Sequence, residues 1–158
     1  MNRRRMMMEN KKPVYIFREG SSTFENTAGE AEFNTEARTS GGIITLDGST
    51  GQSIGTGNPY FYYGKFRVPV DFSKRKTLCI EAWASTKVSA AVGYAENFNI
   101  GVDGGGRPEN YFTVERFERK TYRFDISGIS GNRYICGGIN TIHENAPEAL
   151  KIYNIWLE

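Results

Sequence analysis

The stretch TYRFDISGISGNRYICGGI (residues 121–139), followed by ALKIYNIWLE (149–158), decides the fold expected for this chain. Apolar and polar side chains alternate through residues 120–127, and a turn rich in Gly and Ser leads to a second such run at 133–139. Alternation of this kind turns one face of a strand toward a core and the other toward solvent. We therefore predict strands over 120–127, 133–139 and 149–158.

The rest of the 158-residue chain repeats this pattern, and its 18 Gly and 13% aromatic residues suit β-structure better than helix. Short apolar or alternating runs, separated by Gly, Asn, Ser and Asp, predict six further strands. These are expected at 14–17, 42–47, 60–70, 77–85, 87–95 and 110–117. The best helix candidate, residues 30–37, suits an edge strand or a loop equally well. Eight or nine antiparallel strands indicate an all-β fold, either a sandwich or a barrel.

The chain length matches one domain, and neither an internal repeat nor a low-complexity linker divides it. We expect a basic N-terminal arm over residues 1–12 and a single β-sandwich domain over 13–158. The tract 18–42 is rich in Ser, Thr, Glu and Gly, so we expect it to run over the surface of the domain.

The segments quoted first resemble the last three strands of galactose-binding-like jelly rolls. The resemblance lies in a strand ending in Asp-Ile-Ser (125–127), a Gly-containing turn, a strand with Arg-Tyr-Ile (133–135) and an apolar closing strand. It covers about the C-terminal third and implies a jelly-roll β-sandwich. The uneven spacing of Ile152, Ile155 and Leu157 predicts a β-bulge in the closing strand. This fold carries sugar binding, adhesion and architectural roles, so the function has to be argued from the site.

An aromatic and charged platform is the first candidate site. Alternation in 77–84 puts Leu78, Ile80 and Ala82 on the core face and Cys79, Glu81 and Trp83 on the other. Alternation in 60–68 turns Phe61, Tyr63, Lys65 and Arg67 away from the core. If these two strands pair, one outer face holds Phe61, Tyr63, Arg67, Glu81 and Trp83. Rings beside charged groups suit sugars, whose C–H faces stack on rings. The alternative is that these rings belong to the core of a second sheet.

The glycine-rich segment NIGVDGGGRPEN (99–110) is the second candidate. It lacks the Lys-Ser/Thr ending of a phosphate-binding loop, and Asp103 alone falls short of a calcium site. We interpret it as a long hairpin loop in which Asp103, Arg107 and Asn110 contact a ligand or a neighbouring subunit.

Catalytic and metal-binding patterns are not found in the sequence. The single histidine, His143, lies in a polar turn, and Ser-His-Asp or clustered-His arrangements do not occur. Carboxylate pairs for glycoside hydrolysis can be drawn from Glu81, Glu115, Glu118 and Asp125, as in any sandwich. Cys79 and Cys136 are interpreted as buried small hydrophobic residues, with a disulfide as the alternative. We predict a non-enzymatic protein without cofactor or metal.

The arm carries most of the positive charge. The net charge is +2, but residues 1–12 hold five basic residues against one acidic residue, which leaves −2 for 13–158. A near-neutral body disfavours nucleic-acid binding. The three methionines at 6–8 give way at once to polar residues, so we expect neither a signal peptide nor a membrane span.

The opening run RRRMMM, followed by a polar stretch and then by Tyr-Ile-Phe and Glu-Gly (15–17, 19–20), is similar to virion-associated proteins of phages and prophages of gut bacteria. The TGGW-like segment common in those proteins is missing here. The resemblance implies a phage structural or adhesion protein of the tail, baseplate or capsid, made in the host cytoplasm and present in several copies. It would bind virion proteins or itself through the arm residues Arg3, Arg4, Arg5, Met6, Met7 and Met8. The alternative function is a carbohydrate-binding module for a cell-surface glycan.

Overall fold

The computed structural model describes residues 12–20, 31–33, 37–40, 42–46, 60–66, 69–85, 88–96, 110–141, 148 and 150–158. For residues 31–33, 37–40, 60–66, 88, 140 and 141 it describes the backbone and the strand pairing. The strands are β1 (Val14–Phe17), β2 (Ala31–Phe33), β3 (Ala37–Ser40), β4 (Ile43–Leu46), β5 (Tyr60–Phe66), β6 (Val70–Asp71), β7 (Thr77–Ala84), β8 (Val88–Ala95), β9 (Asn110–Val114), β10 (Lys120–Asp125), β11 (Asn132–Thr141) and β12 (Leu150–Leu157).

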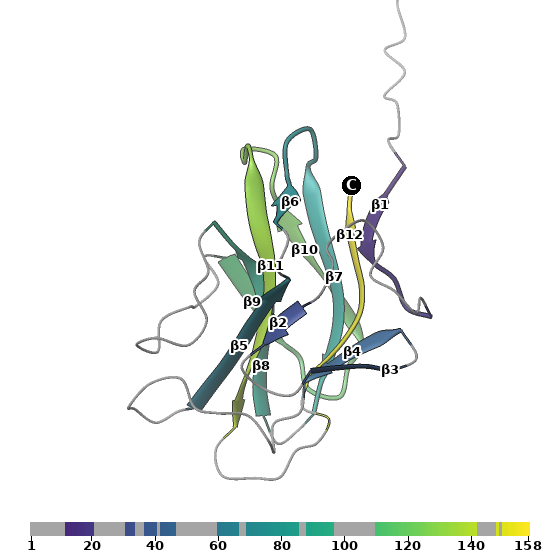
Figure 1. Cartoon of the computed structure of the whole chain (residues 1–158), viewed down its shortest axis with the longest axis vertical. Helices are drawn as coiled ribbons and strands as arrows, with labels where there is room; N and C mark the ends of the chain where they lie inside the picture. The colour runs from purple at the N-terminus through teal and green to yellow at the C-terminus, as the bar shows by residue number, and fades with distance from the viewer. Residues whose placement is uncertain are drawn as a thin grey trace, which may run out of the picture.

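These strands form two antiparallel sheets that pack face to face as a sandwich (Figure 1). Sheet A has the order β10-β7-β12-β4-β3, with β1 paired to β12. Sheet B has the order β2-β5-β11-β8-β9, with β6 paired to β11. The all-β sandwich expected from the sequence is therefore confirmed.

Each of the nine predicted strands has a counterpart, and the short strands β2, β3 and β6 come in addition. The helix candidate at 30–37 is a helix at none of its described positions. Its first part is β2 at the edge of sheet B, and β3 at the edge of sheet A begins at Ala37. The edge-strand alternative is correct because each short segment gains backbone hydrogen bonds from a neighbouring strand.

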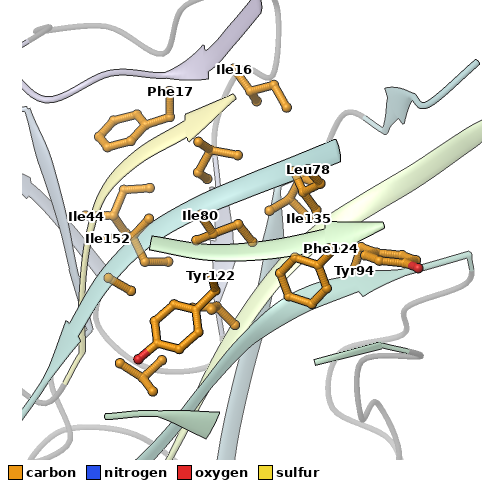
Figure 2. Close-up of a cluster of buried hydrophobic side chains, with 14 of the residues drawn as sticks. Ile16, Phe17, Ile44, Leu78, Ile80, Tyr94, Tyr122, Phe124, Ile135 and Ile152 are labelled. Carbon is orange, nitrogen blue, oxygen red and sulfur yellow. The ribbon is translucent and has the colours of Figure 1, made fainter. Parts of the chain in front are cut away.

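The core lies between the two sheets and is filled by aliphatic side chains with a few aromatic rings (Figure 2). As predicted, Leu78, Ile80 and Ala82 of β7 are fully buried in it. Opposite them, β11 contributes Ile135 and Ile139. Burying one such aliphatic side chain stabilises the fold by about 1.5–3 kcal/mol, which fixes the register of every strand that carries a core face.

The closing strand β12 contains the predicted bulge. Its register against β7 shifts between Ile152 and Asn154, while Ile155 and Leu157 return to the core. The extra residue, Tyr153, is half-buried. The bulge lets β12 keep its apolar residues inward on both sides of the irregular spacing.

Aromatic rings close the side of the sandwich between β9 and β10. The ring of Phe112 lies 4.7 Å from that of Phe124 and 5.8 Å from that of Tyr122, measured between centroids. Tyr94 makes edge contacts with Phe124 and with Phe72. Because Phe112 faces inward, its neighbours on β9 face outward, and this sets the geometry of the candidate site.

Candidate functional site

The two outer surfaces of the sandwich are the candidate sites, and we call them face A (on sheet A) and face B (on sheet B). The predicted platform required β5 and β7 to pair. That pairing is wrong: β5 lies between β2 and β11 in sheet B, whereas β7 lies between β10 and β12 in sheet A (Figure 1). Glu81 and Trp83 therefore belong to face A. The core excludes them because it takes the alternate residues of β7.

Positions 61 and 63 belong to face B. In the β5–β11 ladder, Tyr63 is opposite Gly138 and Phe61 is opposite Asn140, while Tyr62 is opposite the core residue Ile139. Directly opposed residues share a face of the sheet. The expectation that positions 61 and 63 turn away from the core agrees with this register. Arg67, the third member from this strand region, lies outside the described residues.

Small residues occupy face B along the middle of the sheet. On β8 they are Ser89, Ala91, Gly93 and Ala95, and on β11 they include Cys136 and Gly138. Ala91, Ala95 and Cys136 face away from the core and are nevertheless 9%, 1% and 2% exposed. At these positions the face is covered, so a ligand of face B must contact other residues.

Gly93 is small for a specific reason. A Cβ atom placed on it would lie 2.0 Å from the carbonyl oxygen of Asn110, far inside van der Waals contact. The backbone at the start of β9 therefore passes directly over Gly93. Asn110 also donates a hydrogen bond from Nδ2 to the hydroxyl of Tyr94 (2.8 Å). The predicted ligand residue Asn110 thus has a structural contact that holds the beginning of β9 in place.

Tyr111 is the exposed aromatic residue of face B. It is opposite Gly93 in the β8–β9 ladder and is 49% exposed. Among the described residues its ring and hydroxyl have no hydrogen-bond, ring or ion-pair partner. Thr113, two residues further along, is exposed on the same face. A tyrosine with a free ring and a free hydroxyl can stack on an apolar surface and hydrogen-bond at the same time.

Arg116 lies in the turn that follows β9. Its Nη2 donates to the hydroxyl of Ser89 on face B (3.5 Å), and Arg116 makes no ion pair among the described residues. The next residue, Phe117, is 69% exposed at a left-handed φ of 62°. Its N–H donates to the carbonyl of Ala84 (2.9 Å). This backbone bond holds the turn against the end of β7.

Face A is organised around Arg119. The guanidinium donates from Nε to Glu81 Oε1 (2.6 Å) and from Nη1 to Glu19 Oε1 (3.2 Å), and its Nη2 contacts both carboxylates. Its Cζ lies 3.9 Å from the ring centroid of Tyr153. Asn154 closes the cluster by donating to Glu81 and accepting from the N–H of Glu19. The cluster ties the segment after β1 to β7 and β12, which is a structural role.

The aromatic rings of face A are also engaged. Lys151 Nζ lies 5.4 Å from the ring centroid of Trp83. Tyr15 stacks on Trp156 at 5.9 Å, and the guanidinium of Arg18 covers Tyr15 at 4.9 Å. Each of these rings therefore has a cation or another ring beside it, which leaves less free ring surface for a sugar.

Three of the four carboxylates considered for glycoside hydrolysis have a lowered pKa, which is the wrong direction for a general acid. Hydrogen bonds from Arg119 hold the pKa of Glu81 below its usual value, against the opposing effect of burial. Hydrogen bonds from Lys120 lower the pKa of Glu115, and hydrogen bonds from Ser127 lower that of Asp125. The general acid of a glycosidase needs a raised pKa, so none of these three has that property.

The two cysteines are both buried and both free. Cys79 belongs to the outer side of sheet A and Cys136 to the outer side of sheet B, so the disulfide alternative is wrong for this pair. Burial raises the pKa of the Cys79 thiol to about 11 and raises that of Cys136 further. The interpretation as small buried residues is confirmed.

The remaining predicted ligand residues, Asp103 and Arg107, lie outside the described residues. Tyr111, Thr113 and Arg116 were not predicted, although alternation across Asn110–Val114 would have placed Tyr111 and Thr113 together. In the described part of the chain, three or more His, Cys, Asp or Glu side chains nowhere gather as a metal site. Nor does this part contain a helix long and apolar enough to span a membrane.

Neither a family model nor a curated protein matches this sequence. The chain is similar to solved structures of carbohydrate-binding modules. A mutant of the family 29 module CBM29-2 has 14% identity and a TM-score of 0.48, over 93% of this chain and 91% of that one. Another family 29 module has 16% identity and a TM-score of 0.47, over 92% and 87%. The low-affinity xylan-binding module CBM86 from Roseburia intestinalis has 15% identity and a TM-score of 0.44, over 93% of both chains.

Proposed function

We propose that the chain is a carbohydrate-binding module whose binding surface is face B. The observation that carries the proposal is Tyr111, an exposed tyrosine without a partner among the described residues, on the same face as positions 61 and 63. An exposed ring on an outer sheet face suits stacking against the C–H surfaces of sugar rings. The modules of similar fold are named for carbohydrate binding, but the proposal rests on the side chains of this chain.

Polar groups on the same face supply the second half of a sugar site. The hydroxyls of Ser89 and Thr113 are exposed beside the ladder that carries Tyr111. The guanidinium of Arg116 reaches Ser89. Hydroxyl and guanidinium groups fix the orientation of a sugar, because each sugar hydroxyl both donates and accepts hydrogen bonds.

The test is affinity electrophoresis of the folded chain in gels containing soluble polysaccharides, after a glycan array has selected them. Tyr111→Ala should weaken binding about fivefold, since one stacking contact of roughly 1 kcal/mol is lost. Tyr15→Ala is the matched control, because it removes the same atoms from face A. A folded chain that binds no glycan on the array would refute the proposal.

Virion attachment through the arm stays a prediction, because residues 1–11 lie outside the described residues. Lys12 is described, and its carbonyl accepts a hydrogen bond from Nη1 of Arg75 (3.3 Å), between β6 and β7. Deleting residues 1–12 should leave the sandwich folded and abolish assembly, as measured by the urea midpoint and by size-exclusion chromatography.

A further inference from the structure

One row of positions crosses the strands of face B. The ladders put Phe61 of β5 opposite Asn140 of β11, and Asn140 opposite Ser89 of β8. Arg116 extends this row, because its guanidinium contacts the hydroxyl of Ser89. Two strand spacings, about 10 Å in all, separate position 61 from Ser89. The row therefore ends, on its β8 side, in a hydroxyl and a guanidinium that lie in line with positions 140 and 61.

The charge on Arg116 is not neutralised in the described structure. The carboxylate nearest to it in sequence is engaged elsewhere: Glu115 forms an ion pair with Lys120. The other guanidinium of this turn, Arg119, is saturated by Glu81 and Glu19. Arg116 has only its single long contact to Ser89 and is exposed.

The backbone around Arg116 is fixed, which makes its position reproducible. On one side, the N–H of Glu115 donates to the hydroxyl of Tyr122 (2.6 Å). On the other side, the N–H of Phe117 donates to Ala84 (2.9 Å). Phe117 adopts a left-handed φ of 62° although its side chain is 69% exposed. Burial of its ring therefore does not stabilise this unfavourable backbone conformation, and the hydrogen bonds on either side hold the turn.

We propose that the glycan bound by face B is anionic, with a carboxylate or sulfate group paired to Arg116 beside Ser89. This inference rests on the proposed function and names its ligand class. A guanidinium binds carboxylate and sulfate oxygens through two parallel N–H donors, and such charge-assisted bonds are about twice as strong as neutral ones. The sugar ring that bears the anion lies on face B beside Ser89.

The experiment uses the full chain and four uronate polysaccharides: polygalacturonate, alginate, hyaluronan and glucuronoxylan, each with its carboxyl-reduced counterpart. At least one acidic form should bind about tenfold more tightly than its neutral counterpart, since reduction removes one charge-assisted bond. Arg116→Gln should remove this difference by weakening only the acidic form. Arg116→Lys should retain part of it, because the charge remains and the fork is lost.

The matched control is Arg123→Gln, which removes an exposed guanidinium from face A, where it pairs with Glu158. It should leave both forms bound as before, and thermal melting should show every variant folded. Equal binding of the acidic and neutral forms, with Tyr111→Ala still disruptive, would overturn the anionic preference and leave the proposed function standing. Failure of every glycan on the array to bind would overturn both.

Discussion

Face A and face B carry similar kinds of side chain in different states. On face A, Arg119 is saturated by two carboxylates, and the rings of Trp83 and Tyr15 each have a neighbouring cation. On the described part of face B, Tyr111 has no partner and Arg116 has one long contact. Composition alone would favour face A as the binding surface, because face A holds the tryptophans. The contacts favour face B instead, because a binding surface needs side chains that are not already paired within the protein.

The largest effect is expected from Gly93→Ala on face B. The new Cβ would overlap the carbonyl of Asn110, so β9 has to move and Tyr111 moves with it. We expect a loss of about 2 kcal/mol in the free energy of unfolding, measured by urea denaturation, together with loss of glycan binding. The control is Gly128→Ala, where the added atom meets nothing within 4 Å. A fully stable Gly93→Ala variant would show that β9 does not cross Gly93 closely.

Arg119→Met should have the next largest effect, and on face A. It leaves the half-buried carboxylate of Glu81 without its cation and frees the segment at Glu19. Because Arg119 is 40% exposed, solvent screening limits the loss to about 1 kcal/mol. Arg123→Met breaks a single exposed ion pair and should change the free energy of unfolding by less than half as much. Equal effects of the two variants would argue against a cluster centred on Arg119.

Lowering the pH should destabilise the Arg119 cluster of face A, because Glu81 becomes protonated. The pKa of Glu81 is lowered in the folded state, so its stabilising contribution is present above its unfolded pKa, near 4.3, and is lost as the pH falls through the folded value. Urea denaturation from pH 6 to pH 3 should show the free energy of unfolding falling by a fraction of a kcal/mol more in the unchanged protein than in Glu81→Gln. Identical pH profiles for the two proteins would contradict this.

The smallest effect is expected from Trp83→Ala. If the ligand lies on face B, this change on face A should leave glycan affinity within about twofold of the unchanged protein, since the two faces are separated by the core. Affinity electrophoresis on the gels used for Tyr111→Ala measures it. A tenfold loss with Trp83→Ala, and none with Tyr111→Ala, would move the site to face A.

Strand alternation predicted the local structure well. It predicted nine strands, the core residues Leu78, Ile80 and Ala82, and the bulge in β12, because each depends on neighbours along one strand. It also placed positions 61 and 63 on an outer face, which the register against β11 supports. It failed for the shared platform, because closeness of β5 and β7 along the chain does not require them to pair.

The residues of the candidate site were harder to predict. Tyr111 is one of nine tyrosines, and its exposure depends on Phe112 turning inward against Phe124 of the other sheet. Arg116 differs from Arg119, three residues away, in what surrounds it: two carboxylates from distant segments reach Arg119, whereas none of the described carboxylates reaches Arg116. Sequence spacing contains neither fact, since both depend on contacts that form only in the folded structure.

By itself the sequence determined the fold class and the core face of β7, because alternation with a period of two and the avoidance of buried charge act along each strand. Only the tertiary structure decided that Glu81 and Trp83 belong to one outer face and positions 61 and 63 to the other. It also decided that, among the described residues, Arg119 is paired with carboxylates while Arg116 is not, and that Tyr111 has no partner. The physical reason is that strand order and ion pairing join residues far apart in the chain, as Arg119 and Glu19 show across 100 positions.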